Sequence, residues 1–184
     1  SHRAPRGRWP VMGPGLALEQ APPFSAPLRF FLTAPVFLAA AGLLAAWSTG
    51  WSGTPLAPVS LALTHLVTLG FLGMVMLGAL MQILPVVAGS PVPAVGPVAA
   101  VSHAGLAIGT PLLAWGLASG EAAILNAAGL ALGLGLTVFL IPTAISLARA
   151  RALDSVRAMA LSVAALAVTV LLGLSLTAWL AGHW

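Results

Sequence analysis

The sequence of 184 residues contains no cysteine, no tyrosine and no lysine, and only 5% of its residues are charged. The absence of cysteine excludes disulfides, thiolate metal ligands, iron–sulfur clusters and covalent haem attachment. Soluble domains carry about 25% charged residues, whereas hydrophobic residues make up 60% of this chain. The composition therefore predicts an integral membrane protein. Its net positive charge indicates membrane topology and not a nucleic-acid partner, because the arginines flank apolar segments.

Five apolar segments are long enough to cross a bilayer, which requires about 20 helical residues. They cover residues 28–47, 57–88, 98–118, 122–147 and 156–181. The connection over residues 89–97 is rich in glycine and proline, as turns are. The sequence thus predicts an all-α bundle of five transmembrane helices, preceded by an arginine- and proline-rich arm over residues 1–27.

The arginines indicate the orientation of the segments. With five spans, the arm and the connections 89–97 and 148–156 lie on one side of the membrane. All seven arginines lie on or near that side: Arg3, Arg6, Arg8, Arg29, Arg149, Arg151 and Arg157. Cytoplasmic loops are enriched in basic residues. We therefore expect the N-terminus in the cytoplasm and the C-terminus outside, in the cytoplasmic membrane.

Polar residues inside the spans are few: His65, Gln82, His103 and Asn126, with scattered serines and threonines. No acidic or basic residue lies in the middle of a span, which argues against a proton pump or an ion-coupled transporter. The chain also lacks a carboxylate pair, an activated nucleophile and a phosphate-binding loop. The candidate site residues are therefore the two histidines.

His65 lies in the second segment, about 12 Å from its outer end by helical rise. On an α-helix its face continues through Leu69, Leu72, Met76 and Ile83. A wide apolar surface beside one imidazole suits a porphyrin, which is a flat hydrophobe that needs an axial nitrogen. The alternative is that His65 only hydrogen-bonds a neighbouring backbone carbonyl or hydroxyl.

His103 is the second candidate ligand, near the inner end of the third segment. Its helix face carries small residues, which would accommodate either a macrocycle or a neighbouring helix. Because His65 lies toward the outside and His103 toward the inside, we do not expect them to bind one haem within one chain. His2 and His183 would complete a site only with a partner.

The methionines and glycines of the spans have simpler interpretations. Methionine side chains more often fill space between helices than bind a metal. We interpret Met74, Met76 and Met81 in this way, and a copper site is not expected. The frequent glycines, including Gly70, Gly73, Gly129, Gly133 and Gly135, are interpreted as helix-packing positions.

The run from His65 to Pro91 resembles the second helix of the catalytic subunit of the haem–copper oxidases. It contains the sequence GALMQILPVVAGSP, in which Pro85, Gly89 and Pro91 match the P-x-x-x-G-x-P ending of the oxidases. The nitric oxide reductases and small NnrS-like membrane haem proteins are similar too. In this superfamily the helix begins with the axial histidine of the low-spin haem, so the resemblance implies that role for His65.

The resemblance covers one helix only. The catalytic subunits have many more spans, and this chain lacks their copper-site histidines, the accompanying tyrosine and the later helix with the remaining haem ligands. The resemblance therefore does not imply that this chain alone reduces oxygen or nitric oxide.

Together, the sequence predicts a membrane protein that binds non-covalent haem b through His65, with Leu69, Leu72 and Met76 as apolar contacts. Its expected role is electron transfer or the handling of haem or gas ligands. A second axial ligand would come from His103, a second copy, a partner protein or none. A homodimer is the most economical source, because a two-fold axis along the membrane normal places both His65 residues at equal depth.

Two alternatives remain at this stage. The chain is either a non-catalytic structural subunit of a larger respiratory complex, or a small permease with helices broken at Pro85 and Pro142.

Overall fold

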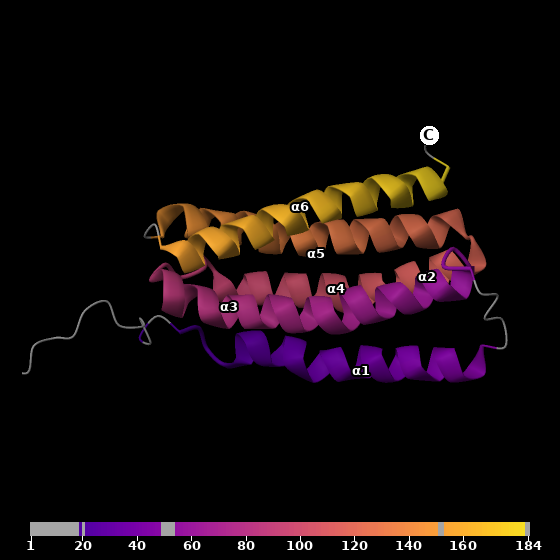
Figure 1. Cartoon of the computed structure of the whole chain (residues 1–184), viewed down its shortest axis with the longest axis horizontal. Coiled ribbons are helices and arrows are strands. Elements are labelled where there is room, and N and C mark those ends of the chain that lie inside the picture. The colour runs from indigo at the N-terminus through magenta and orange to yellow at the C-terminus, as the bar shows by residue number, and fades with distance from the viewer. Residues whose placement is uncertain (1–18, 20, 49–53, 151–152, 183–184) are drawn as a thin grey trace, which may run out of the picture.

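The computed structural model describes residues 19, 21–48, 54–150 and 153–182. These residues form a helical bundle without strands (Figure 1). The elements are α1 (Ser25–Trp47), α2 (Pro58–His65), η2 (Leu66–Gly73), α3 (Met74–Ala88), α4 (Val95–Ser119), α5 (Ala122–Arg149) and α6 (Asp154–Leu180). The π-helix η2 joins α2 to α3, so Pro58–Ala88 is one continuous helical rod.

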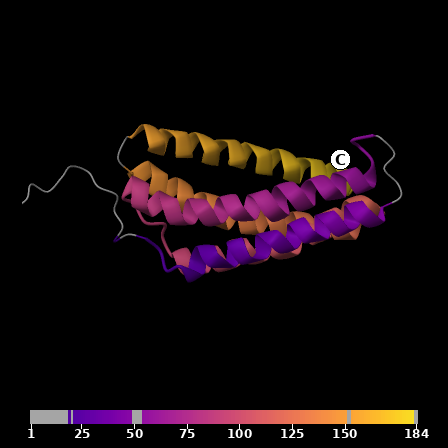
Figure 2. The same cartoon turned by 60° about the horizontal axis from the view of Figure 1, so that its bottom comes forward.

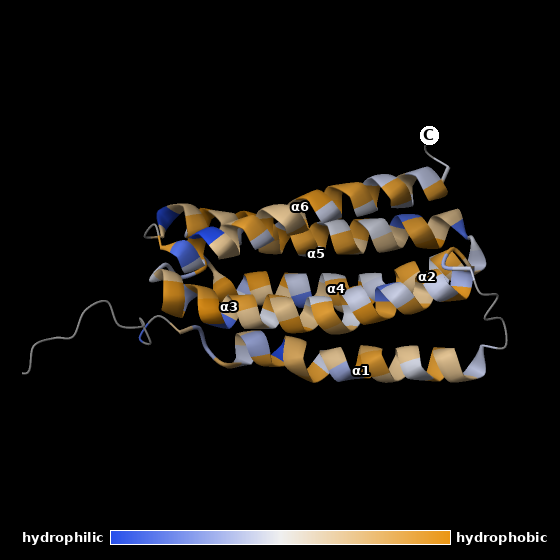
Figure 3. Ribbon diagram, in the orientation of Figure 1, coloured by the Kyte–Doolittle hydropathy of each residue, from blue (hydrophilic) through white to orange (hydrophobic). Residues whose placement is uncertain are grey.

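The described residues thus form five rods, each long and apolar enough to cross a membrane. Their ends lie within three residues of the predicted ones, which confirms the all-α five-span prediction. Apolar residues cover the rods along their length, and hydrophilic residues gather toward the ends (Figure 3). The chain is therefore a multi-pass membrane protein. Its orientation stays a prediction, and residues 1–18 of the arm lie outside the described part.

At the described glycines, the closest approach between two helix backbones lies between α4 and α5. A Cβ added to Gly105 would lie 2.6 Å from the Cα of Gly135, and one added to Gly109 would lie 2.6 Å from Leu132 Cγ. Helices in lipid gain no hydrophobic free energy by association, so van der Waals contact has to hold them together. These glycines are the means by which α4 and α5 reach that contact.

Other predicted packing glycines differ in how closely they are covered. Gly70 of η2 faces Phe37 of α1, whose ring would lie 2.5 Å from an added Cβ. Gly129 and Gly133 make only ordinary contacts with α6, at 3.5 and 3.4 Å. The α1–η2 contact is therefore close, and the α5–α6 contact is loose at these two positions.

α6 and α1 lie at opposite edges of the bundle (Figures 1 and 2). Only 6% of the apolar window of α6 is buried, against 22–44% for the other four rods. Val156 and Val163 are the buried residues of α6. The helix therefore leans against α5 and leaves space between itself and the rest of the bundle.

We predict that Gly105→Ala lowers the unfolding temperature in detergent. The new methyl group would overlap the backbone of α5, and overpacking of this kind costs about 1–3 kcal/mol. Gly42→Ala is the matched control, since nothing lies within 4 Å of its added Cβ. Equal melting temperatures for the two variants would show that the α4–α5 contact does not limit stability.

Candidate functional site

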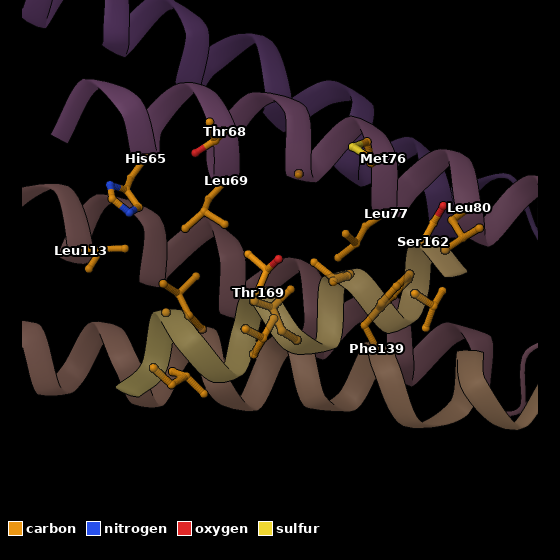
Figure 4. Close-up of a pocket in the computed structure, with 18 of the residues that line it drawn as sticks. His65, Thr68, Leu69, Met76, Leu77, Leu80, Leu113, Phe139, Ser162 and Thr169 are labelled. Atoms are coloured by element: carbon orange, nitrogen blue, oxygen red, sulfur yellow. The ribbon is translucent and has the colours of Figure 1, made fainter. Parts of the chain in front are cut away.

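A cavity of about 850 Å³ lies between the Pro58–Ala88 rod and α6 (Figure 4). Leucines of α4 and α5 and Phe139 form its floor. Its volume falls within the range of about 300–1,000 Å³ that is usual for pockets that hold small molecules. The lining is aliphatic apart from Phe139, five hydroxyls, two thioethers and one imidazole, that of His65. The site is therefore an apolar chamber with a single titratable side chain among its described lining residues.

One hydrogen bond sets the tautomer of His65. Its Nδ1 lies 2.7 Å from the carbonyl oxygen of Leu61, one helical turn earlier. A carbonyl can only accept, so Nδ1 carries the hydrogen, and in the neutral ring Nε2 keeps its lone pair. The ring projects from its helix into the space toward Leu113 and α6 (Figure 4). The alternative considered from the sequence, a bond to a backbone carbonyl, thus occurs and leaves Nε2 available.

A π-helix begins directly after His65 and runs from Leu66 to Gly73. Its i→i+5 hydrogen bonds make a wider turn than those of an α-helix, and such segments occur frequently at functional sites. They also change which residues share a face. Leu69 and Met76 line the cavity as the α-helical register predicts, but Gly73 lines it in place of Leu72. Leu72 is 46% exposed and is not among the lining residues of the cavity.

Four of the five hydroxyl groups in the lining donate their hydrogens within their own helices. Thr68, Ser162, Thr169 and Thr177 each donate to the backbone carbonyl four residues earlier, at 2.7–3.0 Å. This pattern satisfies each donor inside a low-dielectric site without a partner from another helix. The chamber can therefore hold a hydrophobic group without leaving these donors unpaired.

Sequence reasoning missed the contribution of α6 to this cavity. Ser155, Ser162 and Thr169 all line it and recur every seven residues. That interval keeps side chains on one helix face, so the sequence did indicate a polar stripe along this helix. The interval does not show which neighbouring helix the stripe faces.

The methionines divide between cavity and core. Met76 of α3 and Met159 of α6 line the cavity. Met74 and Met81 are buried between helices, at 0% and 1% exposure. The two buried thioethers fill space in the packed core, where a flexible side chain suits irregular gaps.

His103 lies in a different place, between α4 and α1. Its Nε2 is 2.8 Å from Thr33 Oγ1, and that hydroxyl donates to the carbonyl oxygen of Arg29 at 2.8 Å. Because Thr33 has a single hydroxyl hydrogen, Nε2 of His103 is the donor in the bond between them. The ring also meets Phe30 edge-on, with centroids 5.4 Å apart. His103 therefore links α4 to α1 through a hydrogen bond and a ring contact, and it does not line the cavity that contains His65.

The donor set decides which metal the cavity suits. No group of three or more His, Cys, Asp or Glu side chains comes together among the described residues. Zinc and similar ions need three or four protein ligands, whereas haem brings four nitrogens and needs only an axial ligand. A lone imidazole in an apolar chamber fits haem. His2 and His183 lie outside the described residues.

No family model matches the chain, and neither a curated protein nor a solved structure is significantly similar to it. The oxidase-like run from His65 to Pro91 stays a resemblance carried by its own residues.

We predict that His103 and Thr33 stabilise the bundle jointly. His103→Ala and Thr33→Val should each lower the melting temperature, and the double variant should be less destabilised than their sum. Interhelical hydrogen bonds in membranes are worth about 0.6 kcal/mol on average and up to about 1.7 kcal/mol. A double-mutant cycle of unfolding free energies measures this coupling, and strictly additive effects would contradict it.

Proposed function

We propose that this chain binds b-type haem through Nε2 of His65 and serves electron transfer, or the handling of haem or gas ligands, in the membrane. The observation that carries the proposal is the bond from Nδ1 of His65 to the Leu61 carbonyl. Histidines that ligate metals almost always donate their other ring N–H to a carboxylate, carbonyl or water. The resemblance of the His65–Pro91 run to the haem-holding helix of the oxidases supports the same assignment.

The residues around His65 prepare the site in three ways. The Leu61 carbonyl orients the imidazole and fixes its tautomer. The aliphatic walls exclude water and accept a flat hydrophobic macrocycle. Four of the lining hydroxyls keep their donors paired within their own helices. When bound, the haem would supply a redox-active iron whose potential responds to axial ligand, burial and local polarity.

Among the described lining residues, His65 provides the one imidazole nitrogen, and the two thioethers of the cavity lie far from it. Met76 follows His65 by eleven residues on the same rod, so about 16 Å separate them along the axis. Met159 lies near the start of α6, whereas His65 lies near the opposite end of the bundle. The described lining residues would therefore hold a haem through His65 alone, and any further ligand would come from a second copy, a partner protein or a small external molecule.

We expect purified protein to show b-type haem bands in a reduced-minus-oxidised absorption spectrum, and His65→Ala to lose them. Truncation removes the only described imidazole in the cavity, and no neighbouring lining group replaces it. His103→Ala is the matched control and should keep the bands, because its ring belongs to the α1–α4 contact.

Two outcomes would overturn the proposal. Bands that survive in His65→Ala would place the ligand elsewhere. Protein that stays colourless within its intact native complex would leave the structural-subunit interpretation.

A second test fills the cavity instead of removing the ligand. Gly173 lines the cavity, and nothing lies within 4 Å of its added Cβ. We predict that Gly173→Phe lowers the haem-to-protein ratio severalfold while the protein still folds. Ser175→Phe is the control, because this exposed neighbour on α6 does not line the cavity. Equal haem content in the two variants would show that haem does not occupy this space.

A further inference from the structure

A second, smaller cavity of about 360 Å³ lies between α5 and α6. Every side chain that lines it is aliphatic, and five of the eight are alanines: Leu140, Ala144, Leu147, Ala148, Ala160, Val163, Ala164 and Ala167. The alanines are too short to fill the space between the two helices. Ala144, Ala148, Ala160 and Ala164 are exposed, so the groove opens toward the bilayer. No lining side chain offers a hydrogen bond to water, so hydrocarbon suits this groove better than water.

Arginines flank the end of this groove. Arg149 is the last residue of α5 and directly follows Ala148. Arg157 lies on the same stripe of α6 as Ala160 and Ala164, at intervals of three and seven residues. Asp154 lies 3.3 Å from Arg157, and both side chains are exposed. Residues 148–157 contain three arginines and one aspartate, which is a formal charge of +2.

We propose that this groove binds an anionic glycerophospholipid. One acyl chain lies along the alanines, and the phosphate meets Arg149 and Arg157. Every bilayer lipid has a chain that fits an aliphatic groove, so the groove alone selects none. The arginines add the selection, because basic groups between transmembrane helices attract anionic headgroups. The first turn of α6 adds unpaired backbone N–H groups at the same end.

The lipid would act as a packing element for α6. This helix has the smallest buried share of the five rods, and Val163 lines both this groove and the larger cavity. A chain held in the groove supports α6 from one side and so preserves the chamber on the other. The proposal does not require that the larger cavity bind any particular molecule.

Lipid retention and thermal stability test the proposal. Delipidated protein in detergent receives phosphatidylglycerol or phosphatidylcholine with identical chains, and native mass spectrometry counts the bound lipid. We expect phosphatidylglycerol to be retained and to raise the melting temperature, and phosphatidylcholine to do neither. Arg149→Gln with Arg157→Gln should weaken retention roughly thirtyfold, which corresponds to about 1 kcal/mol per arginine. Arg29→Gln, on α1 at the same end of the bundle, is the charge control.

A second variant tests the groove itself. Ala164→Phe fills it and should abolish retention of phosphatidylglycerol, whereas Ala165→Phe, exposed and outside both cavities, should not. Equal retention of the two lipids, or retention that survives both the arginine and the Ala164 variants, would overturn the proposal. An equal rise in melting temperature with inorganic phosphate would do so too, since it would indicate a free-anion site.

Discussion

The close approach of α4 and α5 at Gly105 and Gly135 is the contact on which the rest of the bundle depends. In lipid, contact and internal hydrogen bonding replace the hydrophobic effect as the force between helices. α4 then carries out two tasks from this fixed position. One side of it holds α1 through His103 and Thr33, and another supplies Leu113 and Leu117 to the floor of the larger cavity.

The two intramembrane histidines show how one residue type takes two roles under the same constraint. Each has to satisfy a donor in a medium without water. His103 donates to a hydroxyl of another helix, so its hydrogen bond joins α4 to α1. His65 does so within its own helix, through Leu61, and this leaves its other nitrogen directed at a cavity. The difference lies in the partner of the donating nitrogen, and it separates a structural histidine from a candidate ligand.

The contact between Gly105 and Gly135 does not fix the position of α6. It touches α5 loosely and borders an open cavity on each side, one facing His65 and one facing the arginine-rich end. A bundle with such a helix needs non-protein groups to complete its packing. The proposed haem and the proposed phospholipid would each fill one of these spaces, so occupancy of the two sites and the position of α6 would be linked.

Hydropathy, the length needed to cross a bilayer and the turn residues predicted the five spans and their ends to within three residues. Each of these signals lies within one segment and does not depend on contacts with another helix. The position of His65 in an apolar run was equally local. Tertiary structure alone decided the rest. The π-helix exchanged Leu72 for Gly73 in the cavity, since a wider turn cannot be read from an α-helical pattern. Thr33 became the partner of His103 across 70 positions, and α6 became a cavity wall, because contacts between helices depend on how all five rods pack together.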